Sequence, residues 1–162
     1  MRARQTPVQG ILSGVDAHFV RSRRRFLDLI DAKYFDECRI YRVIPGFIHQ
    51  WGIPKSPTEY KKWGDNKIKD DPVKVSNSKG TLSFATSGPD ARGSQLFVNL
   101  GNNKDLDDQG FSPFAEVTAG FELFNGCAEA KSKVDQQSGK ERGNDYFSQF
   151  PELSYWKSAV RK

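Results

Sequence analysis

Two stretches of the chain, residues 39–51 and 82–100, alternate apolar and polar side chains with the period of two that is typical of β-strands. Each stretch is interrupted by a turn rich in glycine and proline, at residues 45–46 and at residues 87–90. The pattern therefore predicts two pairs of short strands, each pair joined by its own turn.

Each stretch carries one polar side chain on the face where the alternation places apolar neighbours. Arg42 shares a face with Ile40 and Ile44, and Gln95 shares a face with Phe97. Burying a guanidinium or an amide costs free energy unless it finds a hydrogen-bond partner. Arg42 and Gln95 are therefore the first candidates for a functional role.

The rest of the pattern predicts a mainly β protein with a few helices. Strands are expected at residues 38–44, 47–51, 80–85, 94–100 and 114–117, with one short N-terminal strand near residues 8–12 and a last strand near 155–160. Helices are expected at residues 22–33, with Ser22 as N-cap and an inward stripe of Phe26, Leu29 and Ile30, and at residues 120–130. Residues 52–79 are expected to form a long ordered loop, residues 131–143 a solvated linker, and the aromatic tail from residue 144 to dock on the body.

Composition indicates one globular domain without a membrane span. The chain has 162 residues, of which 36% are hydrophobic and 28% charged, and it has no apolar run near the eighteen or so residues that a span requires. The net charge of +5 is concentrated at the N-terminus, because residues 1–25 hold six arginines and a single aspartate. We therefore predict a basic arm at residues 1–21 and one domain at residues 22–162, in which residues 26–162 carry no net charge.

This uneven charge disfavours nucleic acid as a partner, because phosphate-binding proteins spread basic side chains over a face of the fold. The arm is interpreted as a solvated tail or a partner-docking segment, or else as the remnant of an arginine-rich organellar targeting peptide. The two cysteines, Cys38 and Cys127, have no metal-binding spacing and are expected to be free thiols. An intracellular, reducing compartment follows, either the cytoplasm or the matrix of a mitochondrion or plastid.

No cofactor or metal is predicted. His18 and His49 are the only histidines, and neither has a second ligand at a suitable spacing. Asp105, Asp107 and Asp108 lack the downstream glutamate of a calcium loop and are interpreted as a solvated turn.

Three blocks of sequence resemble the cyclophilins, a family of peptidyl-prolyl cis-trans isomerases. Residues 42–50 (RVIPGFIHQ) are similar to the family's RxxPGFxxQ, residues 84–97 (FATSGPDARGSQLF) to its second signature, and Leu106 with residues 114–117 to its third. The resemblance implies a cyclophilin-like antiparallel β-barrel with capping helices. It covers about residues 25 to 130, and the N-terminus is too short and polar for the two strands that open the family's fold, so one or two strands are expected to be missing.

The resemblance also implies the site. Arg42 matches the family's catalytic arginine, and the substrate-binding residues that it implies are Tyr41, Phe47, Ile48, Gln50, Ala85, Thr86, Ser87, Gln95, Phe97 and Leu106. Phe47, Ile48, Phe97 and Leu106 would line a proline pocket, with plain core packing as the alternative. The amides of Gln50 and Gln95 would bind the substrate backbone, and residues 85–87 would form the edge along which a proline-containing polypeptide lies.

Two departures from the family pattern leave a second function open. Tyr41 stands where the family commonly has histidine before the arginine, and Asp105 stands where it has the tryptophan of the pocket. The first hypothesis is a prolyl isomerase that assists protein folding. The alternative is a catalytically weak or inactive scaffold subunit of a larger assembly, with a neighbouring subunit at the open barrel edge or on the basic arm.

Overall fold

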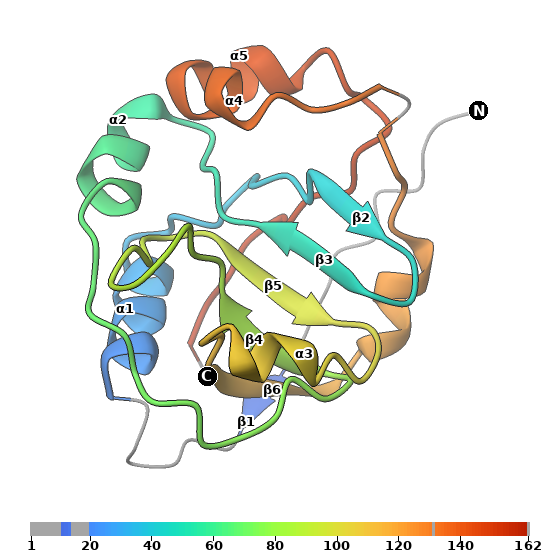
Figure 1. Ribbon diagram of the computed structural model, residues 1–162. Coiled ribbons are helices and arrows are strands. Elements are labelled where there is room, and N and C mark those ends of the chain that lie inside the picture. Colours follow the sequence, from blue (N-terminus) through green and yellow to red (C-terminus); the bar gives the residue numbers. More distant parts are fainter. Residues whose placement is uncertain (1–10, 14–19, 131, 162) are drawn as a thin grey trace.

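The computed structural model describes residues 11–13, 20–130 and 132–161 (Figure 1). Its centre is a six-stranded sheet in the order β1-β6-β4-β5-β3-β2, in which every neighbouring pair is antiparallel. The strands are β1 (Ile11–Ser13), β2 (Arg42–Ile44), β3 (Ile48–Trp51), β4 (Thr81–Phe84), β5 (Leu96–Asn99) and β6 (Pro113–Ala119).

The strand register gives the two faces of the sheet different characters. One row across β2, β3 and β5 reads Arg42, Gln50 and Phe97, and it is polar at the edge and apolar toward the centre. The side chains that alternate with this row point to the opposite face, where the main core gathers. That core includes the buried side chains of Trp51, Leu82, Phe84, Leu96 and Val98.

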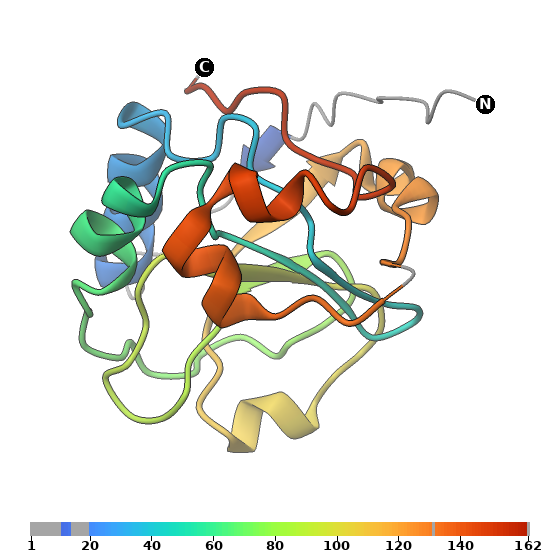
Figure 2. The same cartoon turned by 90° about the horizontal axis from the view of Figure 1, so that it is seen from above.

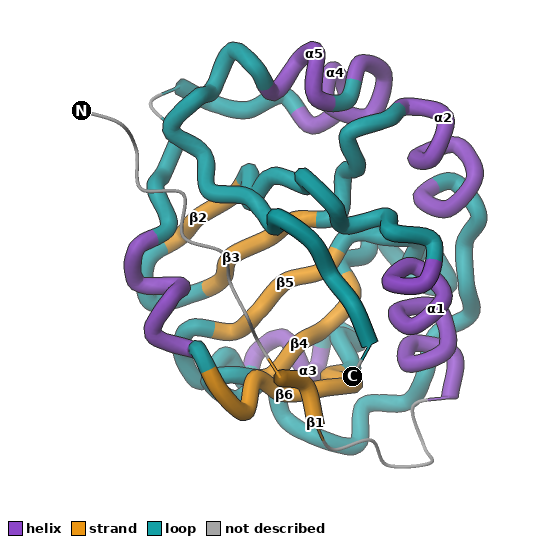
Figure 3. Tube along the Cα trace, turned by 180° about the vertical axis from the view of Figure 1, so that it is seen from behind, coloured by secondary structure: helices purple, strands orange, loops and turns teal. Residues whose placement is uncertain are grey.

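Helices and an extended segment cover the sheet. The short helix α3 (Asp105–Asp108) lies on one side of the sheet, and the C-terminal segment crosses the other (Figures 1 and 3). The segment is held there by Trp156, whose ring packs against Trp51 and Phe124 at centroid distances of 5.1 and 6.0 Å. Both faces of the sheet are therefore at least partly shielded from water.

Helix α1 (Val20–Asp31) confirms the predicted helix and its inward stripe, because Leu29 is fully buried and Phe26 and Ile30 pack against the core. Ser22 was expected to be the N-cap of this helix, but it lies inside the helix. The Ser22 amide and hydroxyl both donate to Asp71 Oδ2, at 2.8 and 2.7 Å. A carboxylate 49 residues away thus satisfies the first turn, which local sequence could not indicate.

The long loop at residues 52–79 is ordered, as predicted. It contains α2 (Pro57–Glu59) and the π-helix η2 (Tyr60–Gly64). Arg25 of α1 reaches into it: its Nη1 donates to the carbonyls of Trp63 and Asn66, at 3.0 and 2.7 Å, and to that of Gly93 at 3.2 Å. One buried arginine from the basic N-terminal stretch therefore ties the loop to the body.

The C-terminal region departs from the sequence prediction. The expected solvated linker contains helix α4 (Gln136–Arg142), which begins at Asp135 because that side chain accepts from the amides of Gln137 and Ser138. Helix α5 (Asn144–Phe147) follows directly, and α4 and α5 lie together at the top of the view in Figure 1 and face the viewer in Figure 2. The aromatic tail docks as predicted, with Tyr146, Phe147 and Phe150 buried.

Two further element predictions were wrong. The expected helix at residues 120–130 is the shorter 3₁₀-helix η3 (Phe121–Gly126). The expected last strand is reduced to one bridge between Arg39 and Tyr155, beside hydrogen bonds that join residues 37–40 to residues 154–156. The predicted strand at residues 38–44 is correspondingly short in β2, because its first half pairs with this segment.

The closed barrel is not seen in the described residues, where β1 and β2 form the two ends of an open sheet. The predicted strand near residues 8–12 overlaps β1, but residues 8–10 and most of the predicted basic arm lie outside the described residues.

Candidate active site

The strand register brings three of the predicted site residues into one row. Arg42 of β2 pairs with Gln50 of β3, and Gln50 pairs with Phe97 of β5. Directly opposite residues in antiparallel strands place their side chains next to each other on the same face. A guanidinium, an amide and a phenyl ring therefore lie side by side although they are up to 55 residues apart in sequence.

A polar network connects this row to the preceding end of β5. Arg42 Nη1 donates to Gln50 Oε1 at 3.1 Å, and Gln50 Nε2 donates to Gln95 Oε1 at 3.1 Å. Gln95 Nε2 in turn donates to the hydroxyl of Tyr60 at 3.3 Å. Since an arginine can only donate, its contact fixes the orientation of the Gln50 amide, with oxygen toward Arg42 and nitrogen toward Gln95.

The hydroxyl of Tyr41 hydrogen-bonds to the side-chain amides of both Gln50 and Gln95. It accepts from Gln50 Nε2 at 3.0 Å and donates to Gln95 Oε1. The ring is 3% exposed and stacks on Phe147 of α5 at a centroid distance of 6.1 Å. Burial raises the pKa of Tyr41 well above its usual value, so the hydroxyl stays protonated and can donate. Tyr41 therefore holds Gln50 and Gln95 in place, and its expected contact with the substrate stays a prediction.

An apolar cluster adjoins the network. Ile48, Phe97 and Leu106 are its buried members, and Phe47, Ala85 and Phe111 pack against them. The ring of Phe111 meets that of Phe97 edge-on, at 5.5 Å and 76°. All four predicted pocket residues are thus brought together. Phe111 was missed because it follows α3 in an irregular segment that shows no periodicity.

The three residues predicted to form a peptide-binding edge differ in what they offer. The Ala85 amide donates to Gln95 O at 2.9 Å and is therefore already used. The Thr86 hydroxyl bonds within its own turn, with the backbone of Gly88. Thr86 and Ser87 follow the end of β4 and line a cavity of about 190 Å³ next to Gln50 and Gln95.

The far wall of this cavity comes from the loop and α4. It is lined there by Tyr60, Gly64, Lys67, Gln136 and Lys140. None of these residues was singled out in the sequence. Tyr60 and Gly64 belong to η2, and Gln136 and Lys140 lie on the helix that was expected to be a linker. Only tertiary packing brings them to the site, so no local pattern could have indicated them.

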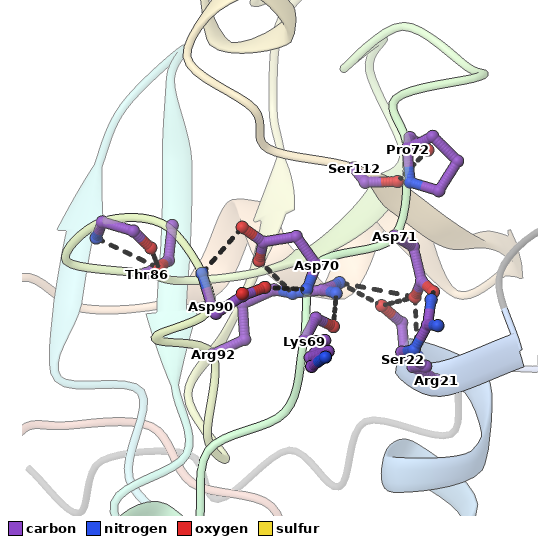
Figure 4. A network of polar contacts seen from close by, with 11 residues as sticks. Arg21, Ser22, Lys69, Asp70, Asp71, Pro72, Thr86, Asp90, Arg92 and Ser112 are labelled. Atoms are coloured by element: carbon purple, nitrogen blue, oxygen red, sulfur yellow. Dashed lines mark hydrogen bonds and ion pairs between the residues drawn. The ribbon is translucent and has the colours of Figure 1, made fainter.

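A second polar network holds the loop that carries Thr86 and Ser87 (Figure 4). Its centre is Arg92, 2% exposed, with Nε 2.8 Å from Asp70 Oδ1 and Nη1 3.5 Å from Asp71 Oδ2. Its Nη1 also donates to the Ser22 hydroxyl and its Nη2 to the carbonyl of Lys69. We call this set of residues the Arg92 clamp.

Asp70 extends the clamp to the turn itself. The Asp70 amide donates to Asp90 Oδ1 at 2.7 Å, and the Asp90 amide donates to Asp70 Oδ2 at 2.9 Å. Asp90 has a positive φ of 54°, a conformation that aspartate tolerates better than most residues. The paired bonds thus fix the turn that forms one wall of the cavity.

Among the described residues, neither the two cysteines nor His49 provides this site with a nucleophile or a general base. Burial raises the pKa of the Cys38 thiol to about 12, and Cys38 and Cys127 are both free. His49 lies on the core face, and burial lowers its pKa to about 4. In the part of the chain that the structure describes, no three histidine, cysteine, aspartate or glutamate residues are grouped as metal ligands. Asp107 accepts instead from Ser76 and Asn77, as a structural anchor.

The arrangement is that of a cyclophilin. Residues 20–143 match the family model for the cyclophilin-type peptidyl-prolyl cis-trans isomerases, and the chain therefore belongs to this family. The match begins at the first residue of α1 and ends just after α4. It contains every residue that was expected at the site.

Individual relatives agree with this assignment. The chain is 33% identical over 106 residues to peptidyl-prolyl cis-trans isomerase-like 3 of Dictyostelium discoideum, covering 62% of this chain and 63% of that one. It is 29% identical over 117 residues to peptidyl-prolyl cis-trans isomerase A of Dickeya dadantii, covering 69% and 62%. It is 34% identical over 110 residues to peptidyl-prolyl cis-trans isomerase CYP18-1 of Arabidopsis thaliana, covering 65% and 67%.

A solved structure is also similar. It is a cyclophilin-type isomerase of Cryptosporidium parvum, crystallised in the presence of the dipeptide Ala-Pro, with a TM-score of 0.63 and 26% identity over 75% of this chain and 81% of that one. The segments that match the Dictyostelium and Dickeya relatives span slightly less than two thirds of each relative's own length. Within the described residues, the helices are all too short or too polar to cross a membrane.

Proposed function

We propose that the chain is a peptidyl-prolyl cis-trans isomerase that accelerates rotation about X-Pro bonds in polypeptides. The observation that carries the proposal is the convergence of Arg42, the amides of Gln50 and Gln95, and the apolar cluster around Phe97 on one face of the sheet. Membership of a family named for this activity supports it.

The reaction needs little chemistry. Rotation about an X-Pro bond faces a barrier of roughly 18 to 20 kcal/mol and takes tens to hundreds of seconds unaided. A turnover of about 10 to 1,000 per second requires the barrier to fall by roughly 4 to 7 kcal/mol. Groups that bind the twisted amide more tightly than the planar one can supply this, without a nucleophile or an acid-base pair.

Each part of the site has a role in this mechanism. The apolar cluster of Phe47, Ile48, Phe97 and Leu106, with Phe111 added, would hold the proline ring. Arg42 is the proposed catalytic residue: it is exposed, and one contact of its guanidinium in the network leaves other N–H groups to donate to the twisted amide. Gln50 and Gln95 would hydrogen-bond the backbone of the substrate on either side of the rotating bond.

A peptide assay tests the proposal. An Ala-Pro-Phe peptide whose trans form alone is cleaved by a protease reports the cis-to-trans rate, and the intact chain should accelerate it. Arg42→Ala should lower kcat/KM by about 100- to 1,000-fold, the loss that follows removal of one preorganised donor to a transition state. Arg42→Lys should restore only part of it, because an ammonium lacks the planar fork.

The result that would overturn the proposal is equally definite. If the intact chain does not accelerate the exchange, or if Arg42→Ala is as fast as the parent, the site does not act as proposed. Nothing in the described part of the chain favours a scaffold role instead, so catalysis is the function that we propose.

Four finer features complete the proposal and remain predictions. These are a cyclophilin barrel shortened by one or two N-terminal strands, a domain boundary near residue 22, a neighbouring subunit at the open sheet edge or on the basic arm, and a reducing compartment. The free thiols of Cys38 and Cys127 support the last.

A further inference from the structure

The cavity next to Gln50 and Gln95 is lined by two lysines and by no carboxylate. Lys67 lies on the long loop and Lys140 on α4, so two segments distant in sequence bring their ammonium groups to one hollow of about 190 Å³. The remaining lining residues are neutral. Two like charges without a counter-charge in the lining make this hollow electropositive.

The position of Lys67 is fixed by the packing of two loops. Its Nζ donates to the carbonyl of Gly64 at 2.5 Å. That carbonyl lies so close to Gly93 that a Cβ on Gly93 would be 2.2 Å from it, and the same Cβ would be 3.2 Å from Lys67 Nζ. The ammonium is therefore held against the segment that leads into Gln95.

The charged form of Lys67 is destabilised in this position. Partial burial lowers the pKa of Lys67, and the nearby charges of Lys140 and Arg25 lower it further, while Asp65 opposes them from outside the lining. An anion entering the cavity would relieve this repulsion. The site thus favours a negatively charged occupant on electrostatic grounds that are independent of shape.

Lys140 is connected to the candidate centre through Tyr60. Its Nζ lies over the Tyr60 ring, 5.7 Å from the centroid, and the Tyr60 hydroxyl accepts from Gln95. Gln95 bonds to Gln50, which bonds to Arg42. The electropositive hollow and the candidate catalytic arginine are therefore two ends of one continuous set of contacts.

We propose that Lys67 and Lys140 form a specificity site for an anionic side chain, carboxylate or phosphorylated, that lies within about three residues of the isomerised proline. The proposal rests on the isomerase function and adds a substrate class to it. An extended peptide advances about 3.3 Å per residue and alternates its side chains. A side chain near the proline can thus enter the cavity from one position, while its immediate neighbour points away.

A set of six peptides would locate the site, each with one glutamate at one of the three positions before or the three positions after an Ala-Pro dipeptide. The control for each peptide carries glutamine at the same position, because glutamine is equal in size and uncharged. We expect glutamate to raise kcat/KM by about 3- to 10-fold at one position, as for two partly exposed ion pairs. The gain should shrink at 0.5 M salt, where screening shortens to a few ångströms.

A phosphoserine peptide at the same position separates the two anion sources. A larger gain with phosphoserine than with glutamate identifies the phosphorylated side chain as the preferred ligand, and the reverse identifies the carboxylate. Either result supports the proposal, because both anions use the two lysines.

Substitution tests the assigned residues. Lys67→Gln with Lys140→Gln should abolish the preference for glutamate while leaving turnover of the glutamine peptide within about twofold. Lys61→Gln is the matched control, because Lys61 is an exposed lysine on η2 that is absent from the cavity lining. It removes one positive charge nearby and should keep the preference.

Three outcomes would overturn the proposal. They are equal rates for glutamate and glutamine peptides at all six positions, a preference that survives the double substitution, and an equal loss in Lys61→Gln, which would indicate only a long-range field. An absence of turnover with every peptide would instead refute the isomerase function. In that case peptide binding followed by NMR would still decide whether glutamate is preferred.

Discussion

Two arginines, Arg42 and Arg92, are placed in opposite ways. Arg92 is 2% exposed, and each of its guanidinium nitrogens faces a fixed oxygen of the protein, from Asp70, Asp71, Ser22 or Lys69. Arg42 is exposed, and its guanidinium reaches the network through Gln50 Oε1. The two side chains have the same chemistry, but within the described residues Arg92 has several hydrogen-bond and ion-pair partners and Arg42 has one.

The difference separates a structural arginine from one that can act on a substrate. A buried cation is tolerated only when fixed partners replace its hydration, and its burial keeps a substrate from reaching it. An exposed cation held by one contact keeps its orientation and still presents free N–H groups. Burial combined with the number of partners, rather than residue type, therefore indicates which arginine is the catalytic candidate.

Replacing Arg92 should lower the free energy of unfolding more than the other substitutions that we propose. Arg92→Met leaves the carboxylate of Asp71, 1% exposed, without its buried charged partner and with only the exposed Arg21, whose Nη1 is 3.5 Å from Asp71 Oδ1. Loss of one member of a buried ion pair costs about 3 to 5 kcal/mol. Urea unfolding followed by tryptophan fluorescence measures the free energy of unfolding. Arg42→Met is the matched control and should cost less than about 0.5 kcal/mol. Equal losses in the two variants would contradict the distinction.

His49 adds a third case, a buried polar group whose Nδ1 has no hydrogen-bond partner in the described part of the chain. Burial lowers its pKa from 6.5 to about 4. The unfolded chain therefore takes up a proton near pH 6.5, while the folded chain does not until about pH 4. Stability should be complete above pH 6.5 and fall as the pH drops toward 4, by up to about 1.4 kcal/mol per pH unit.

The variant His49→Leu isolates this contribution. Leucine fits the apolar surroundings of His49, whose ring lies 5.9 Å from that of Phe124, and it does not titrate. The difference in unfolding free energy between parent and variant should change between pH 7 and pH 4.5. A constant difference over that range would show that His49 does not resist protonation.

The smallest effect is expected from Tyr41→Phe, which keeps the ring on Phe147 and removes the hydroxyl beneath Gln50 and Gln95. Loss of these hydrogen bonds should cost about 1 kcal/mol of stability. Without the hydroxyl, the amides of Gln50 and Gln95 can rotate, so kcat/KM should fall by about 3- to 10-fold, measured with the same Ala-Pro-Phe peptide.

Tyr60→Phe is the control, because it removes one long contact of 3.3 Å to Gln95 and leaves Tyr41 in place. Its effect on kcat/KM should be smaller. A Tyr60→Phe loss that equals or exceeds that of Tyr41→Phe would show that Tyr41 does not position the two amides.

The sequence predicts the parts of the fold that depend on local periodicity. The strands around Arg42, Gln50 and Phe97 appear where the alternation indicated, and helix α1 has the expected apolar stripe. The candidate site residues also come together, because strand pairing preserves the register of side chains that the period of two defines.

Long-range contacts account for what the sequence did not indicate. Asp71 reaches Ser22 across 49 residues, and the start of the predicted strand at residues 38–44 pairs with a segment more than 110 residues away. Helix α4 was missed because it is polar on most sides. It is stabilised by Asp135 at its start and by the close packing of Gly139 on Phe147, where a Cβ would lie 2.8 Å from the ring.

The stacking of Tyr41 on Phe147 has a consequence for where the domain can be cut. The family match ends at residue 143, four positions before Phe147. A fragment trimmed to the family boundary would keep all the predicted contact residues but lose the ring on which their support rests. Such a fragment would retain the signature of the family in its sequence, but the ring of Tyr41 would no longer be packed on Phe147, and the side chains of Gln50 and Gln95 would be less firmly positioned.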